Sequence, residues 1–355
     1  MDLPGMDPQL LALIHRLSID SGCPRVALVG GAVRDLLLQQ SGKHPGFIQD
    51  YDFVVEGDAL PLAEAIQLYC GEKRVPWLRS HAAFHTVAIE VDSLSLDLAS
   101  ARRETYLSPA ANPVVEQASL EIDLTRRDFS INAMALVFQE HTDELCLLDP
   151  YGGAKDLVNG ELVFLHADSV KDDPTRVIRA ARYGARLGFD LDSGSLQQLQ
   201  TTLERWPWAW RHGDAVDVVP PALGTRLRME LDLLLEREPW PQALALLQSW
   251  AALPLLDPLL QSEAKLTRRL RLAARLQLPL LSALIAAAGD PVALAKRLQI
   301  PIQQLRWLAQ LQELRHWLEQ EVLLQSWRQW GAREWTARLE QANWPAPVVA
   351  LAVIE

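Results

Sequence analysis

The chain has 355 residues, of which 49% are hydrophobic, and its formal net charge is −11. This length and apolar content exclude a disordered chain and a single small core, and they favour two or three domains. The acidic balance argues against a protein that coats nucleic acid without specificity, although it leaves room for a local basic groove.

The three cysteines, Cys23, Cys70 and Cys146, lie far apart in the sequence. This spacing predicts neither a disulfide framework nor a structural zinc site, and it fits a reducing, cytoplasmic location. No basic-then-apolar signal opens the chain, and no apolar run reaches the roughly 18 residues of a membrane span. We therefore expect no membrane partner.

The first part of the chain mixes helical and strand-like patterns. Leucine spacing predicts a helix over 9–18, and apolar runs bounded by turn residues predict the remaining elements. These are strands over 25–29, 52–55, 75–79, 85–91 and 94–100, with helices from about 32 and over 59–70.

After about residue 128 the pattern becomes mainly helical. The stretch "DFSINAMALVF" (128–138) predicts a helix, and "ELCLLD" (144–149) contains a short strand. From about residue 172 prolines separate a series of amphipathic helices rich in Leu, Ala and Arg. We therefore expect an α/β head followed by a long helical body.

Two acids stand together in the stretch "QDYDFVVEG" (49–57). Because strand side chains alternate, Asp50 and Asp52 point to one face and Tyr51 to the other. In "LSLDLAS" (94–100), Asp97 faces away from its neighbouring leucines, so pairing of the two strands would add a third carboxylate to this surface. Oxygen ligands of this kind suit Mg²⁺. Taken alone, a D-x-D pattern is more often a turn or a helix cap.

The stretch "LVGGAVRD" (28–35) places Gly30 and Gly31 between an apolar strand and a helix N-terminus. Free backbone N–H groups there, with the helix dipole and Arg34 one turn further on, would form an anion site. A plain tight turn is the alternative, since the stretch matches neither the G-x-G-x-x-G pattern nor the P-loop.

Two later stretches are rich in arginine. In "DLTRRDFSINAMAL" (123–136), Arg126 and Arg127 suit phosphate or an internal carboxylate, and Asp128 is a candidate cap for the helix expected after it. The stretch "KLTRRLRLAAR" (265–275) would face either RNA phosphates or solvent.

The stretch "DDPTRVIRAARYGARLGF" (172–189) predicts a helix that starts at Pro174. Its arginines recur at intervals of three or four residues, which places them on one face. A solvated basic face is the usual explanation of such a pattern. Asp173 with Arg176 also forms a mixed acceptor and donor pair, which can match the edge of a nucleobase. The arginines of this face are Arg176, Arg179, Arg182 and Arg186.

Taken together and in this order, these motifs resemble the class II tRNA nucleotidyltransferases, the CCA-adding enzymes and their bacterial poly(A) polymerase relatives. The resemblance covers about 25–235 and includes "LDLASARRETY" (96–106), "DPYGGAKDL" (149–157) and "LGTRLRMELDLLL" (223–235). It implies an α+β protein with a polymerase-β-like head of a small mixed sheet and helices, followed by an all-helical neck, body and tail. The implied domains are a catalytic head over 1–140, a base-recognition neck over 141–235 and a tRNA-binding body and tail over 236–355.

The resemblance also implies catalytic roles. Asp50 and Asp52 would hold two Mg²⁺ ions, with Asp97 as the third acid. The ions would activate the tRNA 3′-hydroxyl for in-line attack on the α-phosphate of CTP or ATP, with release of pyrophosphate. A flexible loop that helps to switch the choice of base would begin at residues 102–104, which are Arg102, Arg103 and Glu104.

Further residues would hold the nucleotide. Gly30, Gly31 and Arg34 would bind the triphosphate, and Arg127 and Asp128 would contact phosphate and ribose. The incoming base would be recognised by side chains of the neck instead of a nucleic-acid template. These side chains would be Asp173, Arg176 and Arg179.

The sequence departs from the family pattern at two positions. Asp172 stands before Asp173 where the family usually has Glu, and His85 stands where a Gly is expected. The second acid of the pair is kept, so base pairing by Asp173 remains compatible with the sequence.

Four activities fit these motifs. Within the family, the candidates are complete CCA addition, CC-only addition, and A-only or poly(A) addition. The loop after Arg103 is not short, which favours CCA or A addition, whereas the head lies close to the start of the chain, which favours CCA or CC addition. From a different class, a catalytically silent RNA-binding relative is the fourth candidate, and the presence of all the acids argues against it.

Overall fold

A computed structural model describes residues 3, 5–42, 50–81, 85–139, 144–323 and 330–355, with the side chains of 50 and 321–323 outside the description. The chain forms two compact units. The first comprises Met1–Leu107, Pro113–Ser169 and Asp190–Ser195, and the second comprises Ser108–Asn112, Val170–Phe189 and Leu196–Glu355.

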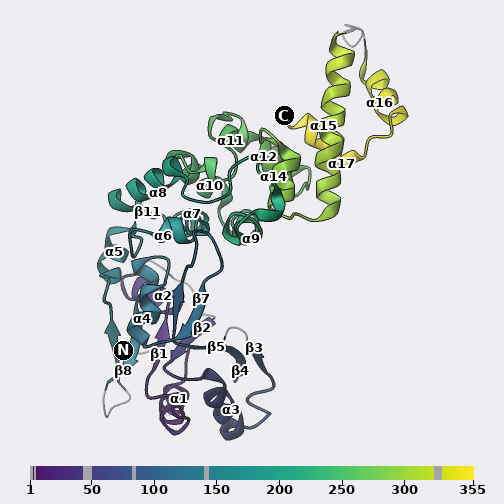
Figure 1. Ribbon diagram of the computed structural model, residues 1–355. Coiled ribbons are helices and arrows are strands. Elements are labelled where there is room, and N and C mark those ends of the chain that lie inside the picture. The colour runs from purple at the N-terminus through teal and green to yellow at the C-terminus, as the bar shows by residue number, and fades with distance from the viewer. Residues whose placement is uncertain (1–2, 4, 43–49, 82–84, 140–143, 324–329) are drawn as a thin grey trace. The chain divides into compact units, whose positions relative to one another are not determined.

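The first unit is built on a seven-stranded mixed sheet ordered β3-β4-β5-β2-β1-β8-β9 (Figure 1). Its strands are β1 (Val26–Val29), β2 (Asp50–Val55), β3 (Leu78–His81), β4 (Thr86–Val91), β5 (Leu94–Ser100), β8 (Ala135–Phe138) and β9 (Leu145–Leu148). Only β2 and β5 are parallel, and the other neighbours in the sheet are antiparallel. The two-stranded pairs are β6 (Arg102–Thr105) with β7 (Val114–Gln117), and β10 (Glu161–Leu162) with β11 (Asp190–Leu191).

Short helices accompany this sheet. They are α1 (Pro8–Asp20), α2 (Gly31–Gln40), α3 (Ala59–Cys70), α4 (Leu120–Thr125), the 3₁₀ turn η2 (Ser130–Asn132) and α5 (Gly153–Asn159), and α6 (Ser169–Asp172) follows them. Local chemistry sets their ends. The Asp58 carboxylate accepts from the Leu60 backbone N–H at 3.1 Å at the start of α3, and Gly71, with φ of 75°, ends it.

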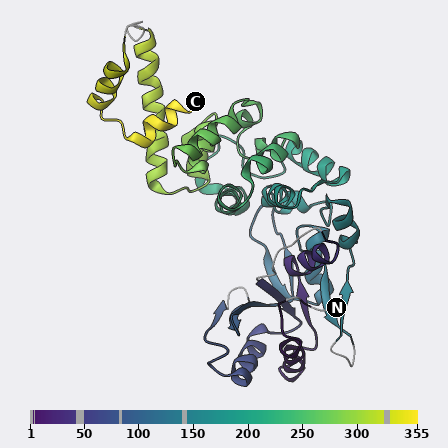
Figure 2. The same cartoon turned by 180° about the vertical axis from the view of Figure 1, so that it is seen from behind.

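The two faces of the sheet are covered differently. Helices α1 and α3 lie side by side on one face (Figures 1 and 2). There Ile14 of α1 and Ile66 of α3 share a core with Tyr51 and Phe53 of β2. On the other face Val54 packs in a smaller cluster with residues of β1 and α4. Because Asp52 alternates with Tyr51 and Phe53, it belongs to this second face.

The predicted order of elements in this unit is largely confirmed, with two corrections. Residues 75–79 were expected as a strand, but β3 runs over Leu78–His81. Residues 128–138 were expected as a helix, but they form the η2 turn and then β8, which pairs with both β1 and β9. The apolar run from Ala133 to Leu136 is fully buried, so pairing within the sheet overrides the helical propensity of Ala, Met and Leu.

The second unit is helical. Its α-helices are α7 (Thr175–Leu187), α8 (Ser193–Arg205), α9 (Thr225–Arg237), α10 (Trp240–Ser249), α11 (Pro258–Ser262), α12 (Leu266–Arg275), α13 (Leu280–Ala286), α14 (Pro291–Arg297), α15 (Ile302–Leu323), α16 (Ala332–Gln341) and α17 (Ala346–Val353). The 3₁₀ turns are η3 (Val216–Val218), η4 (Pro221–Leu223) and η5 (Leu253–Leu255). Helix α7 packs on α9 and α10, and α17 packs on α15.

The α+β fold class is confirmed by this arrangement of a mixed sheet followed by helices. The short strand expected within 144–149 is β9, which completes the edge of the large sheet. The segment 141–235, which the resemblance implies to be an all-helical neck, also contains the two-residue strands β10 and β11, which pair with each other. Among the helices of the described part of the chain, none is both long and apolar enough to cross a membrane.

Candidate functional site

The acids of β2 and β5 meet across the only parallel pair of the large sheet. Asp52 and Asp97 are direct partners in its register, and both are exposed. They line a cleft of about 320 Å³ that Arg126 and Arg127 also border. Two carboxylates at neighbouring positions repel each other unless a cation lies between them, so this pair suits a divalent ion.

The third predicted acid is placed only by its backbone. Asp50 is the first residue of β2 and pairs with Ser95, and its side chain lies outside the described residues. Among the side chains that are described, no group of three His, Cys, Asp or Glu residues is arranged to hold a metal ion. The metal-binding role of the three acids therefore stays a prediction.

The predicted glycine turn lies beside the acid pair. Gly30 has φ of 69° and ψ of −131°, a conformation that a side chain disfavours. A Cβ at Gly30 would lie 2.9 Å from Arg127 Nη1 and 3.9 Å from Asp52 Oδ2. The Gly30 N–H donates to the Met134 carbonyl at 3.4 Å, and helix α2 begins without a side-chain cap. The turn therefore brings the N-terminus of α2 to Asp52 and Arg127.

Arg127 is held by a network of charges. Its Nη2 donates to Asp123 Oδ2 at 3.1 Å, and the other oxygen of this fully buried aspartate accepts from Arg126 at 2.7 Å. Arg126 also pairs with Glu104 at 3.2 Å, which in turn pairs with Arg102 at 2.8 Å. Burial lowers the pKa of Arg127 and the Asp123 carboxylate opposes this shift. Arg126 and Arg127 were predicted to suit either an internal carboxylate or a phosphate. Arg127 is bound to an internal carboxylate and also borders the cleft.

Arg34 lies beneath the glycine turn and is almost completely buried. Its Nη1 donates to Asn132 Oδ1 at 2.8 Å, and the Asn132 amide donates to Asp128 Oδ1 at 2.9 Å. Asp128 also accepts from the Phe129 N–H at 2.9 Å. The expectation that Asp128 caps an α-helix is wrong, since it fixes the η2 turn instead. Contacts of Arg34 and Asp128 with a nucleotide stay predictions.

The "DPYGGAKDL" motif supports this turn from below. Asp149 accepts from the N–H groups of Gly153 and Ala154, at 2.7 and 2.9 Å, and so starts α5. A Cβ on Gly153 would lie 2.2 Å from the Ser130 carbonyl oxygen, so only glycine allows α5 to approach so closely. The Ser130 hydroxyl donates to Asp156 at 2.5 Å. The motif therefore holds the segment that carries Asn132.

The predicted flexible loop begins as a hairpin. Arg102, Arg103 and Glu104 lie in β6, which pairs with β7, and the turn between the strands spans 106–113. Within the second unit, Ala110 is fully buried at the tip of this turn. Its N–H donates to the Asp172 carbonyl and its own carbonyl accepts from the Ala222 N–H, both at 3.1 Å.

In the second unit, Asp173 is 6% exposed and both of its carboxylate oxygens have partners. Oδ1 accepts from the N–H and the hydroxyl of Thr175, at 3.1 and 2.6 Å. Oδ2 forms an ion pair with Arg226, from the first turn of α9. Arg176 is also buried, at 4% exposure. The predicted template residues are therefore present in α7 and just before it, and Arg226 joins them.

The other arginines of α7 face acids of its neighbour. Arg179 pairs with Glu230 at 3.1 Å, Arg182 with Glu230 and Glu238, and Arg186 with Glu238. These ion pairs join α7 to α9 and to Glu238 directly after it, while the Arg186 side chain stays 40% exposed. A nucleotide contact by Arg179 stays a prediction.

The position of His85 explains why glycine is expected there. His85 has φ of 51°, in the left-handed region, and its carbonyl accepts from the Ser100 N–H at 3.0 Å. This backbone conformation costs an L-residue about 1 kcal/mol and a glycine almost nothing.

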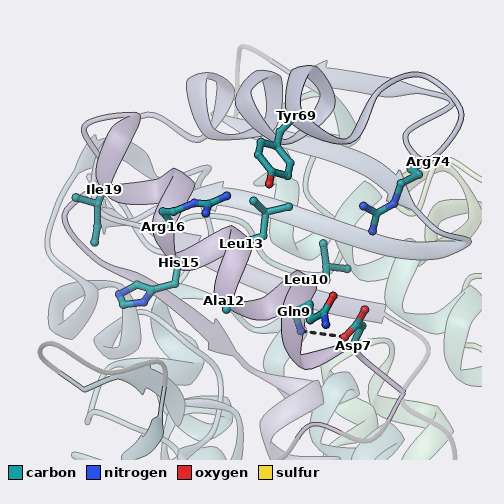
Figure 3. A pocket seen from close by; sticks show the side chains of 10 residues that line it. All are labelled: Asp7, Gln9, Leu10, Ala12, Leu13, His15, Arg16, Ile19, Tyr69 and Arg74. Carbon is teal, nitrogen blue, oxygen red and sulfur yellow. Dashed lines mark hydrogen bonds between the residues drawn. The ribbon is translucent and has the colours of Figure 1, made fainter.

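A larger cavity, of about 650 Å³, is lined by side chains of α1 and the end of α3 (Figure 3). These helices cover the face of the sheet opposite to Asp52. The cavity is lined mainly by α1, with Tyr69 at the end of α3 and Arg74. Arg16 lies over the Tyr69 ring at 5.2 Å, and Arg74 pairs with Asp92. None of the predicted site residues lines this cavity.

Sequence reasoning missed Asp123, Asn132 and Arg226. Each lies inside a motif quoted above, but the spacing gives no sign of its partner. Asn132 and Arg34 are far apart in the sequence, and the contact of Arg226 with Asp173 requires α9 to pack on α7.

Comparison with known proteins identifies the family. The family model of the poly A polymerase head domain matches residues 26–163. A CC-adding tRNA nucleotidyltransferase of Deinococcus radiodurans is 36% identical over 305 residues, which cover 83% of this chain and 72% of that protein. The chain belongs to the tRNA nucleotidyltransferase family.

Other relatives within the tRNA nucleotidyltransferase family share parts of the chain. An A-adding tRNA nucleotidyltransferase of Aquifex aeolicus is 42% identical over 176 residues, which are 50% of this chain but only 20% of that longer protein. A solved CCA-adding enzyme in an apo form has a TM-score of 0.69 at 26% identity and covers 87% of this chain and 72% of its own. A CCA-adding enzyme solved with CTP has a TM-score of 0.66 at 25% identity, covering 87% and 71%.

Proposed function

We propose that the chain adds C residues, A residues or both, from CTP and ATP, to the 3′ end of tRNA. This proposal rests mainly on one observation. Asp52, Asp97 and Arg127 line the same cleft, beside the Gly30 turn. The CC-adding tRNA nucleotidyltransferase of D. radiodurans, which matches 83% of this chain, supports the reaction class. A solved relative bound to CTP supports the nucleotide class.

We propose Mg²⁺ as the cation of this cleft, held by Asp52 and Asp97 together with Asp50. The fit rests on the direct opposition of two exposed carboxylates on neighbouring strands, which is a donor set of hard oxygens. Bound there, two Mg²⁺ ions would supply Lewis-acid activation of the tRNA 3′-hydroxyl and neutralise charge on the triphosphate.

The protein's own groups would bind and orient the triphosphate. Gly30 lets the N-terminus of α2 come close to the acids, and the first N–H groups of this helix, with its dipole, suit phosphate oxygens. Arg127 adds a cation whose place is fixed by Asp123. A pre-positioned cation stabilises developing charge without having to reorganise.

The second unit would choose the base and bind tRNA. Asp173 and Arg176 are the proposed base-reading residues, and Arg179 lies one turn further along the same helix. We propose the acceptor arm of tRNA as the partner of the helices beyond residue 236, and a cytoplasmic location, which the three free thiols suit.

A transfer assay tests the proposal. Purified protein is incubated with Mg²⁺, a tRNA that lacks its 3′-terminal CCA, and each labelled nucleotide in turn. We expect incorporation of C, A or both and none of U or G. Incorporation of C followed by A indicates complete CCA addition, C alone indicates a CC-adding enzyme, and repeated A indicates a poly(A) polymerase.

The variant Asp52→Ala should abolish incorporation and leave tRNA binding, measured by filter retention, nearly intact. Asp20→Ala, at an exposed acid near the end of α1, serves as the matched control and should retain activity. Retained transfer by Asp52→Ala would remove this residue from the reaction, and no transfer by the unaltered chain would favour a silent RNA-binding relative.

A further inference from the structure

Both oxygens of the Asp173 carboxylate are held by neighbouring residues of the second unit. Thr175 holds Oδ1 with two hydrogen bonds, which leaves Oδ2 as the oxygen able to accept from a ligand. Oδ2 is bound to Arg226. Burying a carboxylate side chain until it is only 8% exposed has a modest free-energy cost only when a cation and hydrogen bonds satisfy its oxygens.

Arg226 is itself incompletely satisfied. Its Nη1 is buried and has no hydrogen-bond partner among the described residues, whereas the same guanidinium is bound to Asp173. A buried donor without a partner loses the hydrogen bonds it had with water and gains none in their place. A guanidinium in this state gains from any acceptor that is brought to it.

Backbone hydrogen bonds fix the positions of the segments that carry Asp173 and Arg226. Asp173 directly follows Asp172, whose carbonyl accepts from Ala110, and Ala222 lies shortly before α9, which begins with Arg226 in its first turn. Ala110, with φ of 63° and no exposed surface, bridges these two segments. The separation of Asp173 and Arg226 is therefore set by backbone hydrogen bonds as well as by the ion pair.

This arrangement matters for the choice of base. Cytosine and adenine both present an amino donor beside a ring-nitrogen acceptor, whereas uracil and guanine present a carbonyl acceptor beside an N–H donor. An ionised carboxylate oxygen can accept from the amino group of the first two and repels the carbonyl of the others. Discrimination then depends on Asp173 keeping the orientation of its Oδ2.

We propose that Arg226 is a specificity-determining positioning residue, which holds Asp173 Oδ2 aimed at the amino group of an incoming cytosine or adenine. This inference rests on the proposed function and adds to it a residue from outside the α7 segment. Arg226 acts through Asp173, so its removal should impair base choice and nucleotide affinity more than the rate of transfer.

The experiment compares Arg226→Met, Arg226→Lys, Asp173→Asn and the double variant Asp173→Asn/Arg226→Met. Arg237→Met is the control, because Arg237 is an exposed arginine of the same helix. kcat and KM are measured for CTP, ATP and UTP on tRNA lacking CCA. Arg226→Met should raise KM for CTP and ATP about tenfold, with a smaller change in kcat, and raise relative UTP use about tenfold. Arg226→Lys, which keeps the charge, should show smaller increases in the KM for CTP and ATP and in relative UTP use.

The double variant decides how Arg226 acts. If it works through Asp173, the double variant should be no worse than Asp173→Asn alone. Independent, additive losses would overturn the proposal, as would a base choice by Arg226→Met equal to that of the unaltered protein. A melting temperature near that of the control shows that Arg226→Met is folded, and if it is not, Arg226→Lys carries the same comparison.

Calorimetric titration with CTP and UTP separates this inference from the proposed function. If the unaltered chain prefers CTP and Arg226→Met does not, the positioning role stands even where no transfer is seen. Equal preference in both proteins refutes the positioning role, whatever the activity.

Discussion

At Gly30, one backbone conformation serves two purposes. Its positive φ turns the chain from β1 into α2, and the missing side chain leaves room for Arg127 beside Asp52. Gly42 also has a positive φ, of 70°, but nothing lies within 4 Å of a Cβ built there. A side chain at Gly42 would therefore add backbone strain alone, whereas one at Gly30 would add strain and also crowd Arg127.

We expect Gly30→Ala to lower transfer at least about a hundredfold, because the added methyl group displaces Arg127 and misplacement of about 1 Å has effects of this size. Gly42→Ala should destabilise the fold by about 1 kcal/mol and leave transfer unchanged. Steady-state kinetics and urea unfolding of both variants check this. Equal loss of activity in the two would show that the site tolerates the methyl group and that strain alone is responsible.

Asp156 offers a test of pH dependence. Burial raises its pKa above the ordinary value of 3.8, and the hydrogen bond from Ser130 opposes this more weakly. The folded state then binds the proton more tightly than the unfolded state, so this group's contribution to stability falls as the pH rises through the folded-state pKa and stays low above it.

We expect Asp156→Asn, which keeps an acceptor for Ser130, to unfold at higher urea concentration than the unaltered protein at pH 7. The difference should shrink as the pH falls towards 4. Asp20→Asn controls for the loss of one charge. An advantage that stays constant across this pH range would show that the gain does not come from the ionisation of Asp156.

At the scale of elements, the two arginine-rich helices have opposite environments. The stripe on α7 is joined to acids of α9, which ties the two helices together. On α12 the inward Arg269 is buried and lies within 4 Å of Glu263 and Glu355. The outward cations of α12 are exposed and have no ion pair among the described residues. They are Arg268, Arg271 and Arg275, together with Lys265 directly before the helix.

An unpaired basic face in a chain of net charge −11 is suited to a polyanion. We expect Arg268→Glu/Arg271→Glu to weaken tRNA binding at least about tenfold and to flatten its dependence on salt, because each phosphate contact contributes close to one unit of slope. Lys73→Glu/Arg79→Glu, at exposed cations of the first unit, makes the same change of charge and should have little effect. Equal weakening by both pairs would indicate a general effect of net charge.

For the whole molecule, the existence of two compact units bears on unfolding. Ile66 of α3 and Leu270 of α12 are both fully buried, each inside its own unit. We expect calorimetry to resolve two unfolding transitions. Ile66→Ala should lower the temperature of one and Leu270→Ala that of the other, because each change lowers the free energy of unfolding of its unit by about 2–5 kcal/mol. A single transition that both variants shift equally would show that the units unfold as one.

Much of this molecule could be predicted from local patterns. The alternation in β2 and β5 placed Asp52 and Asp97 on the polar side of their strands, and glycine and proline marked most boundaries. The segment 128–138 could not be predicted in this way, because its conformation is decided by its partners β1 and β9. The contacts of Arg34 with Asn132 and of Asp173 with Arg226 likewise depend on packing between elements that are distant in the sequence.

The parallel pairing of β2 with β5 also has a consequence for synthesis of the chain. Asp52 leaves the ribosome well before Asp97, and the sheet gains β8 only when residues 135–138 have emerged. Long-range pairings of this kind form late and slowly. A nascent chain therefore keeps Asp52 and Asp97 apart until β2 pairs with β5, and the large sheet is complete only when most of the first unit has been made.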